Sequence, residues 1–138
     1  MKNLTFQEKT LWISLFAVIF VYGLYYLNVL PAVDGNMETP HIWQYFKYIG
    51  LLILVIVIGV VAIAIKDRNE LVDERQKLIE MKADRVSAYL LHSGILVAIV
   101  VAMFVPGNYW FIHTITVVGV LTDVVNKIQQ LLAYKRGY

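Results

Sequence analysis

Cysteine is absent from this chain, and proline and charged residues are scarce. The 138 residues include no cysteine, three prolines and 16% charged residues. Without cysteine the protein forms no disulfides or thiolate metal sites, which excludes disulfide-forming and quinone-linked thiol oxidoreductases of membranes. The net charge of +2 is small. Its concentration beside apolar segments points to membrane topology and anionic headgroups, and we expect no nucleic acid partner.

Hydrophobic residues dominate the composition. They make up 59% of the chain, against roughly 45–50% in soluble domains. They fall into four runs, each close to the roughly 20 residues that a helix needs to cross a bilayer. An open sheet cannot span a membrane, so the β-branched second run is also predicted to be helical. We expect one all-α polytopic domain over residues 1–138, with spans at 11–30, 45–65, 86–105 and 109–127.

Lysine and arginine are distributed unevenly around these spans. They lie before the first span, between the second and third, and after the fourth, while the connections between the first two and the last two spans have none. We expect a multi-pass protein of the plasma membrane, which in a bacterium is the inner membrane. The positive-inside rule predicts that its N- and C-termini are cytoplasmic. Pro106-Gly107-Asn108 forces the last two spans to be antiparallel neighbours. The predicted fold is two antiparallel hairpins in a four-helix bundle.

The charged stretch at 67–85 has a helical period and is predicted to run unbroken into the third span. Val72, Ile79, Ala83, Val86 and Leu90 recur at spacings that place them on one face. The result is an amphipathic cytoplasmic helix that extends this span. One interpretation is a solvated face that caps the bundle, and the other is a docking surface or regulatory gate. The candidate contact residues are Asp73, Glu74, Arg75 and Lys82.

Small residues recur every fourth position in the third span, at Gly94, Ala98 and Ala102. Such a ladder lets another helix backbone approach closely. It serves either packing within the bundle or a homo-oligomer interface.

Polar residues line one side of the third and fourth spans. In the fourth they are Thr116, Gly119, Thr122, Asp123, Asn126 and Gln130, and in the third Arg85, Tyr89 and His92. Counting from the Pro106 turn places His92 and Asp123 at nearly the same depth. Ionisable groups in a span usually face the bundle and have a partner. The candidate intramembrane polar cluster is therefore Arg85, Tyr89, His92, Asp123 and Asn126.

This polar cluster has two main interpretations, a structural clamp or a proton or ion relay. A metal site lacks enough ligands, so no metal and no cofactor are expected. Tyr22, Tyr25 and Tyr26 are interpreted as aromatic residues at the membrane boundary, with a ligand pocket as the alternative. His113 is likewise interpreted as an interfacial histidine.

Two comparisons with known families follow from these residues. The first span has no acidic residue, whereas small multidrug transporters place one there. The chain resembles a group of small four-helix bacterial membrane proteins with a charged Asp-Glu-Arg cytoplasmic segment. The residues that carry this resemblance are Asp73-Glu74-Arg75, Leu78-Ile79, Lys82 and Arg85 to Tyr89. That group has no established activity, so the resemblance implies a membrane location and little else.

The functional expectation is a non-enzymatic membrane subunit, because the sequence contains no paired nucleophile and base or phosphate-binding loop. Its expected partners are the lipid bilayer, a second copy of the chain, and a membrane or cytoplasmic protein bound through the cytoplasmic helix. The alternative is a small ion channel or proton-coupled transporter that uses the polar stripe of the third and fourth spans.

Overall fold

Helices are the only regular secondary structure in the described part of the protein. The computed structural model describes residues 4–29, 39–66 and 74–136. They form α1 (Phe6–Val29), α2 (Thr39–Lys66), α3 (Glu74–Phe104) and α4 (Tyr109–Arg136). Each helix is long and apolar enough to cross a membrane. The prediction of an all-α chain with four candidate spans is confirmed, and this is the architecture of a multi-pass membrane protein.

The helices begin earlier or end later than the predicted spans, and local signals explain two of the starts. At the start of α1, Thr5 and Glu8 form a capping box. The Glu8 carboxylate accepts from the Thr5 N–H at 2.9 Å, and the Thr5 hydroxyl oxygen accepts from the Glu8 N–H at 3.2 Å. In α2, Pro40 stands in the first turn, where its missing N–H costs no hydrogen bond.

From Glu74 onward, the charged stretch and the third span form one continuous helix. α3 has 31 residues, about 46 Å at 1.5 Å per residue, which exceeds a hydrocarbon core of about 30 Å. Val72 and the rest of 67–73 lie outside the described residues. Of the predicted apolar face, Ile79 and Ala83 are buried, whereas Val86 and Leu90 are exposed. Ser87 takes the next buried position, because a small side chain allows close helix approach while larger apolar ones are equally stable against lipid.

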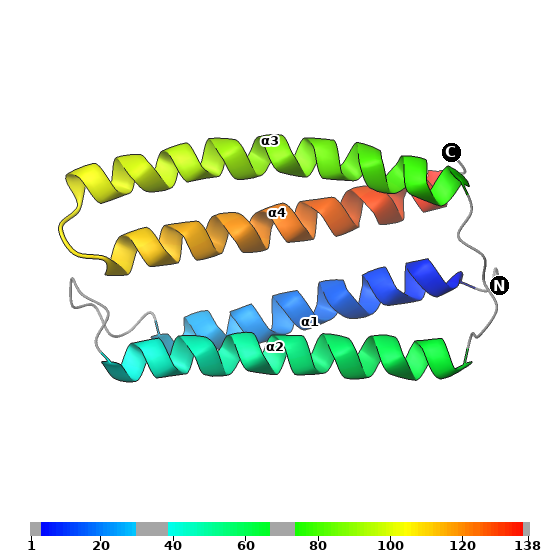
Figure 1. Ribbon diagram of the computed structural model, residues 1–138, viewed down its shortest axis with the longest axis horizontal. Coiled ribbons are helices and arrows are strands. Elements are labelled where there is room, and N and C mark those ends of the chain that lie inside the picture. Colours follow the sequence, from blue (N-terminus) through cyan, green and yellow to red (C-terminus); the bar gives the residue numbers. More distant parts are fainter. Residues whose placement is uncertain (1–3, 30–38, 67–73, 137–138) are drawn as a thin grey trace.

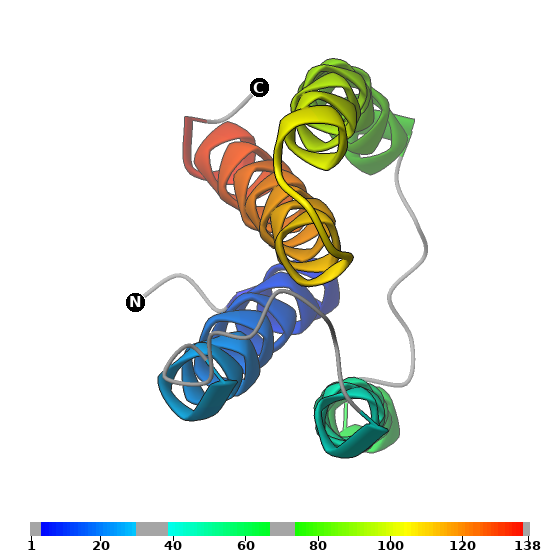
Figure 2. The ribbon, with the colours of Figure 1, turned by 90° about the vertical axis from the view of Figure 1, so that its left-hand side faces the viewer.

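The four helices pack in the order α3, α4, α1, α2. Among the described residues, close backbone contacts join α3 to α4, α1 to α2 and α1 to α4, and the backbone of α2 makes none with α3 or α4. The view along the helices shows α2 and α3 displaced toward the same side of the central α1–α4 pair (Figure 2). The assembly is thus an open arc. The most apolar window of α2 contains no buried residue.

Along the helix axes, the assembly has two ends, and each end contains a different set of helix termini (Figure 1). We call one end the turn end, where α1 ends, α2 begins and residues 105–108 join α3 to α4. We call the other the terminal end, where α1 and α3 begin and α2 and α4 end. In the turn, Gly107 has a φ of 88°, which a residue without a Cβ adopts without strain.

The α3–α4 contact uses most of the predicted small-residue ladder. A Cβ built on Gly94 would lie 2.2 Å from Cγ1 of Val118, so the two helices approach closely there. Ala98 is fully buried, and α4 is the only described helix that contacts α3. Ala102 is exposed. Gly94 and Ala98 therefore pack within the chain, and the predicted homo-oligomer interface loses two of the three residues of the ladder.

Candidate functional site

Polar side chains on α4 repeat at the spacing of one helix face, from the turn end to the terminal end. They are His113, Thr116, Asp123, Lys127, Gln130 and Tyr134. The successive spacings of three, seven, four, three and four residues keep them on one side of the helix. We call this set the α4 stripe. It differs from the stripe predicted from sequence because it begins at His113 and continues to Tyr134. It contacts α1 at both of its ends and α2 at the turn end.

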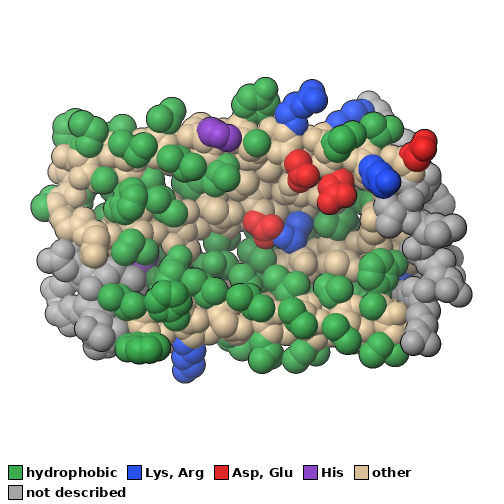
Figure 3. Space-filling view, viewed as in Figure 1, with side chains coloured by type: hydrophobic (Ala, Val, Ile, Leu, Met, Phe, Trp, Pro, Cys, Tyr) green, Lys and Arg blue, Asp and Glu red, His purple; other side chains and the backbone are tan. Residues whose placement is uncertain are grey.

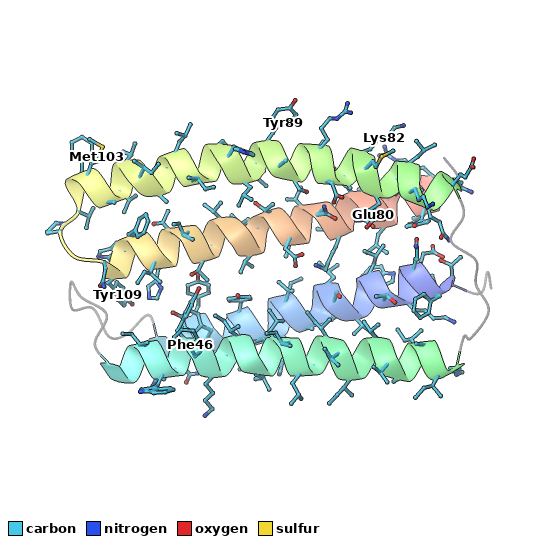
Figure 4. The ribbon with its side chains drawn as sticks, viewed as in Figure 1. Phe46, Glu80, Lys82, Tyr89, Met103 and Tyr109 are labelled. Atoms are coloured by element: carbon cyan, nitrogen blue, oxygen red, sulfur yellow. The ribbon has the colours of Figure 1, made fainter. Side chains whose placement is uncertain are left out.

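The first part of the α4 stripe lies in a cluster of aromatic rings at the turn end. Tyr25 and Tyr109 are 1% and 0% exposed and His113 is 5% exposed. The Tyr25 hydroxyl lies 3.3 Å from Nδ1 of His113, and the rings of Tyr109 and His113 meet edge to face with centroids 4.1 Å apart. Tyr109 points from α4 toward α1 and α2 (Figure 4). This aromatic cluster is the contact that joins α1 to α4 at the turn end.

Helix α2 joins the same cluster through its own tyrosines. Tyr45 and Tyr48 pack edge to face on Tyr25, with centroids 5.7 and 5.5 Å away. The Tyr45 hydroxyl lies 3.1 Å from the Thr116 hydroxyl, and Asn28 donates to Tyr48 at 3.0 Å. The interpretation of Tyr25 and His113 as residues at the membrane boundary concerned their depth and did not predict their packing between helices. Both are buried between helices, because in a membrane edge-to-face rings supply specific contacts that apolar side chains lack.

Midway along α4, Asp123 forms an ion pair with Lys127 one turn later. The Lys127 side chain is 14% exposed and that of Asp123 is 42% exposed. Asp123 lines a cavity of about 280 Å³ together with residues of α1, α2 and α4, among them Tyr22, Tyr45, Thr116 and Gly119. We call this the mid-span groove. Because the two charges are opposite, their pairing lowers the free-energy cost of placing either one within a span.

The predicted intramembrane polar cluster does not assemble within the chain. Asp123 bonds Lys127, while Asn126 donates to Asp84 of α3 at 2.8 Å. His92 instead contacts the carbonyl of Ala88 in its own helix at 2.6 Å. Tyr89 is 72% exposed and points away from α4 (Figure 4). Arg85 is exposed as well.

The reason lies in the helical phase of α3. The residues that pack on α4 are Ile79, Ala83, Ser87, Gly94 and Ala98. At about 100° per residue, Arg85, Tyr89 and His92 lie on the opposite side of the helix. The predicted match in depth between His92 and Asp123 is also approximate, because the contacts of Asp84 with Asn126 and of Gly94 with Val118 put His92 about one turn from Asp123 along the axis. Sequence reasoning missed Asp84, although its position in the last charged turn before the apolar run places it level with polar residues of α4.

At the terminal end, α3 and α4 enclose a groove of about 230 Å³. It is lined by Arg75, Leu78, Ile79, Lys82, Ala83, Gln129 and Ala133. We call this the terminal groove. Of the four predicted contact residues, Arg75 and Lys82 line it, Glu74 is exposed in the first turn of α3, and Asp73 lies outside the described residues. The face in Figure 3 carries acidic and basic side chains over α4 and the first half of α3, whereas α2 is largely hydrophobic.

The described residues contain no group of three His, Asp or Glu side chains arranged to hold a metal ion. The interactions that these residues make are hydrogen bonds and ring contacts between helices and an ion pair within α4. A scan against protein-family models finds no match, and searches of curated proteins and of solved structures find no significant match.

Proposed function

We propose that this protein is a non-enzymatic interaction subunit of the plasma membrane. The lysine and arginine distribution puts the terminal end on the cytoplasmic side, with α1–α2 and α3–α4 inserted as two antiparallel hairpins. In this orientation the terminal groove faces the cytoplasm or the inner headgroup layer. The subunit then offers a cytoplasmic protein a fixed binding surface at the membrane.

The observation that carries this proposal is the chemistry of the terminal groove. The exposed Leu78 and the partly buried Ala133 supply apolar contact surface above the buried Ile79 and Ala83, and Arg75 and Lys82 place two positive charges along it. Leu78 is exposed although it belongs to the most charged part of the chain. An apolar groove flanked by cations fits an amphipathic helix with acidic residues beside its apolar face. The partner proposed is an acidic amphipathic segment of a cytoplasmic protein.

Photo-crosslinking in cells tests this proposal. A benzoylphenylalanine at position 78 is expected to form an adduct with a second protein, whose cross-linked segment carries acidic residues. Arg75→Glu should reduce the yield of this adduct severalfold, because it places a negative charge beside the acidic segment. The matched control is the same probe at Ile53, an exposed apolar residue of α2. Adducts that are equally strong at both positions, or indifferent to Arg75→Glu, would contradict the proposal.

A second candidate function is a small proton or ion pathway along α4. The α4 stripe and its partners on α1 and α2 provide polar groups in both halves of the span, from the Tyr25–His113 pair to the contact of Tyr134 with Gln7. A conducting path needs polar groups through the whole membrane, and these residues favour such a path. The ion pair of Asp123 with Lys127 argues against this pathway, since a carboxylate held by a lysine is poorly placed to accept and release protons.

A further inference from the structure

Two sets of polar groups within the spans are left uncovered, and they lie on different helices. One is the carboxylate of Asp123 in the mid-span groove, which pairs with Lys127 of its own helix but whose side chain is still 42% exposed. The other is the stripe of Arg85, Tyr89 and His92 on the face of α3 opposite α4. A charged or polar side chain that faces lipid within a span is costly, because lipid offers it no hydrogen-bond partner. Each set therefore gains from a polar partner at its own depth.

The two sets lie at matching depths. Asp84 bonds Asn126, and Gly94 packs against Val118, which defines one antiparallel register between α3 and α4. In this register Tyr89 is level with about residue 122, next to Asp123. Arg85 and His92 lie about one turn to either side, roughly 5 Å along the axis. An arginine side chain is long enough to cover that offset.

A second copy with the same orientation in the bilayer has the same groups at the same depths. A twofold axis parallel to the helices turns the exposed face of α3 in one copy toward the groove of the other, and the contact is then formed twice. The open arc supplies the space, because the backbone of α2 packs closely only on that of α1, and both α2 and α3 lie on one side of the α1–α4 pair (Figure 2). A Cβ built on Gly119 of the groove would meet nothing within 4 Å, so a helix backbone can approach there.

We propose that two copies form a parallel dimer in which α3 of each copy enters the mid-span groove of the other. In this dimer the Arg85 guanidinium of one protomer binds the Asp123 carboxylate of its partner, and His92 lies over Gly119. The Arg85–Asp123 clamp suggested by the sequence is thus formed between chains instead of within one. This interface is separate from the terminal groove and does not depend on the proposed cytoplasmic partner.

Cross-linking of two differently tagged chains in lipid vesicles tests the geometry. The chain has no cysteine of its own, so any disulfide that forms joins the introduced cysteines. His92→Cys in one chain and Gly119→Cys in the other should give a disulfide-linked dimer carrying both tags. The control pairs Gly119→Cys with Phe20→Cys, since Phe20 is an exposed residue of α1. Equal cross-linking of the control pair would overturn the proposed arrangement.

The charge contact is tested by the dimer dissociation constant in the same vesicles. Arg85→Gln should raise it roughly 3- to 15-fold, the range expected for a polar contact between spanning helices. Arg85 lies outside the contacts that α3 makes with α4, so this variant should keep its helix content and thermal stability. Asp123→Asn should give a similar shift, and combining Arg85→Asp with Asp123→Arg should restore association. A wild type that stays monomeric at high protein-to-lipid ratio, or a dimer unaffected by either single change, would exclude the interface.

Failure of the dimer and failure of the proposed function are distinguishable. A monomeric protein that still forms the acidic adduct at position 78 would retain the cytoplasmic role and lose the dimer. A dimer whose position 78 forms no adduct would show the reverse.

Discussion

Gly94 of α3 and Val118 of α4 lie so close that a Cβ on Gly94 would stand 2.2 Å from Cγ1 and 3.0 Å from Cβ of Val118. At this point α3, the longest of the described helices, packs closely on α4. Together with the bond between Asn126 and Asp84, it defines the register of the α3–α4 pair. The position of every polar group on the far face of α3 follows from this register.

Gly94→Ala should destabilise the fold by about 1–3 kcal/mol, because the valine at 118 is β-branched and cannot move its Cβ out of the way. The measurement is reversible unfolding in mixed micelles, followed by circular dichroism. Val118→Ala in the same chain should recover much of the loss. Gly50→Ala is the matched control, since a Cβ there meets nothing within 4 Å. Equal losses for the two glycine variants would show that α3 and α4 do not approach closely at Gly94.

Asp123→Asn separates the two candidate functions. If α4 conducts protons, wild-type protein in proteoliposomes should show a flux that falls to background in Asp123→Asn, because an amide cannot change charge. Asp84→Asn is the control, since Asp84 is an exposed carboxylate on α3, outside the α4 stripe. Under the interaction function neither variant has a flux to lose. A wild type without flux above empty vesicles would remove the pathway candidate.

The cytoplasmic position of the terminal end is tested by labelling single cysteines in intact cells. The cysteine-free chain gives no background. Asn36→Cys, in the connection between α1 and α2, should react with an impermeant thiol reagent. Gln76→Cys, in the first turn of α3, should react only after the cells are opened, because the lysine and arginine distribution keeps that end inside. The opposite pattern would invert the topology and place the terminal groove outside the cell.

The existence and approximate extent of the helices could be predicted from sequence. Hydropathy over about 20 residues and the Pro106-Gly107-Asn108 turn are local signals, and they located all four helices and the α3–α4 connection. The helix ends were less accurate. The Thr5–Glu8 capping box and Pro40 extend α1 and α2 beyond their apolar runs, since a polar turn can be helical outside the hydrocarbon core.

Which side of each helix is buried was decided by the tertiary structure alone. In water, an apolar stripe identifies the buried side of a helix, but in a bilayer lipid covers apolar side chains as well as protein does. Val86 and Leu90 could therefore turn outward while Ser87 turned inward, which carried Arg85, Tyr89 and His92 away from Asp123. Tyr25 and His113 are buried for a related reason, since edge-to-face ring contacts between helices, and not hydrophobicity, select them. Sequence by itself determined the spans and the depth of each polar group along them, whereas packing of small residues and edge-to-face rings decided which of those groups meet.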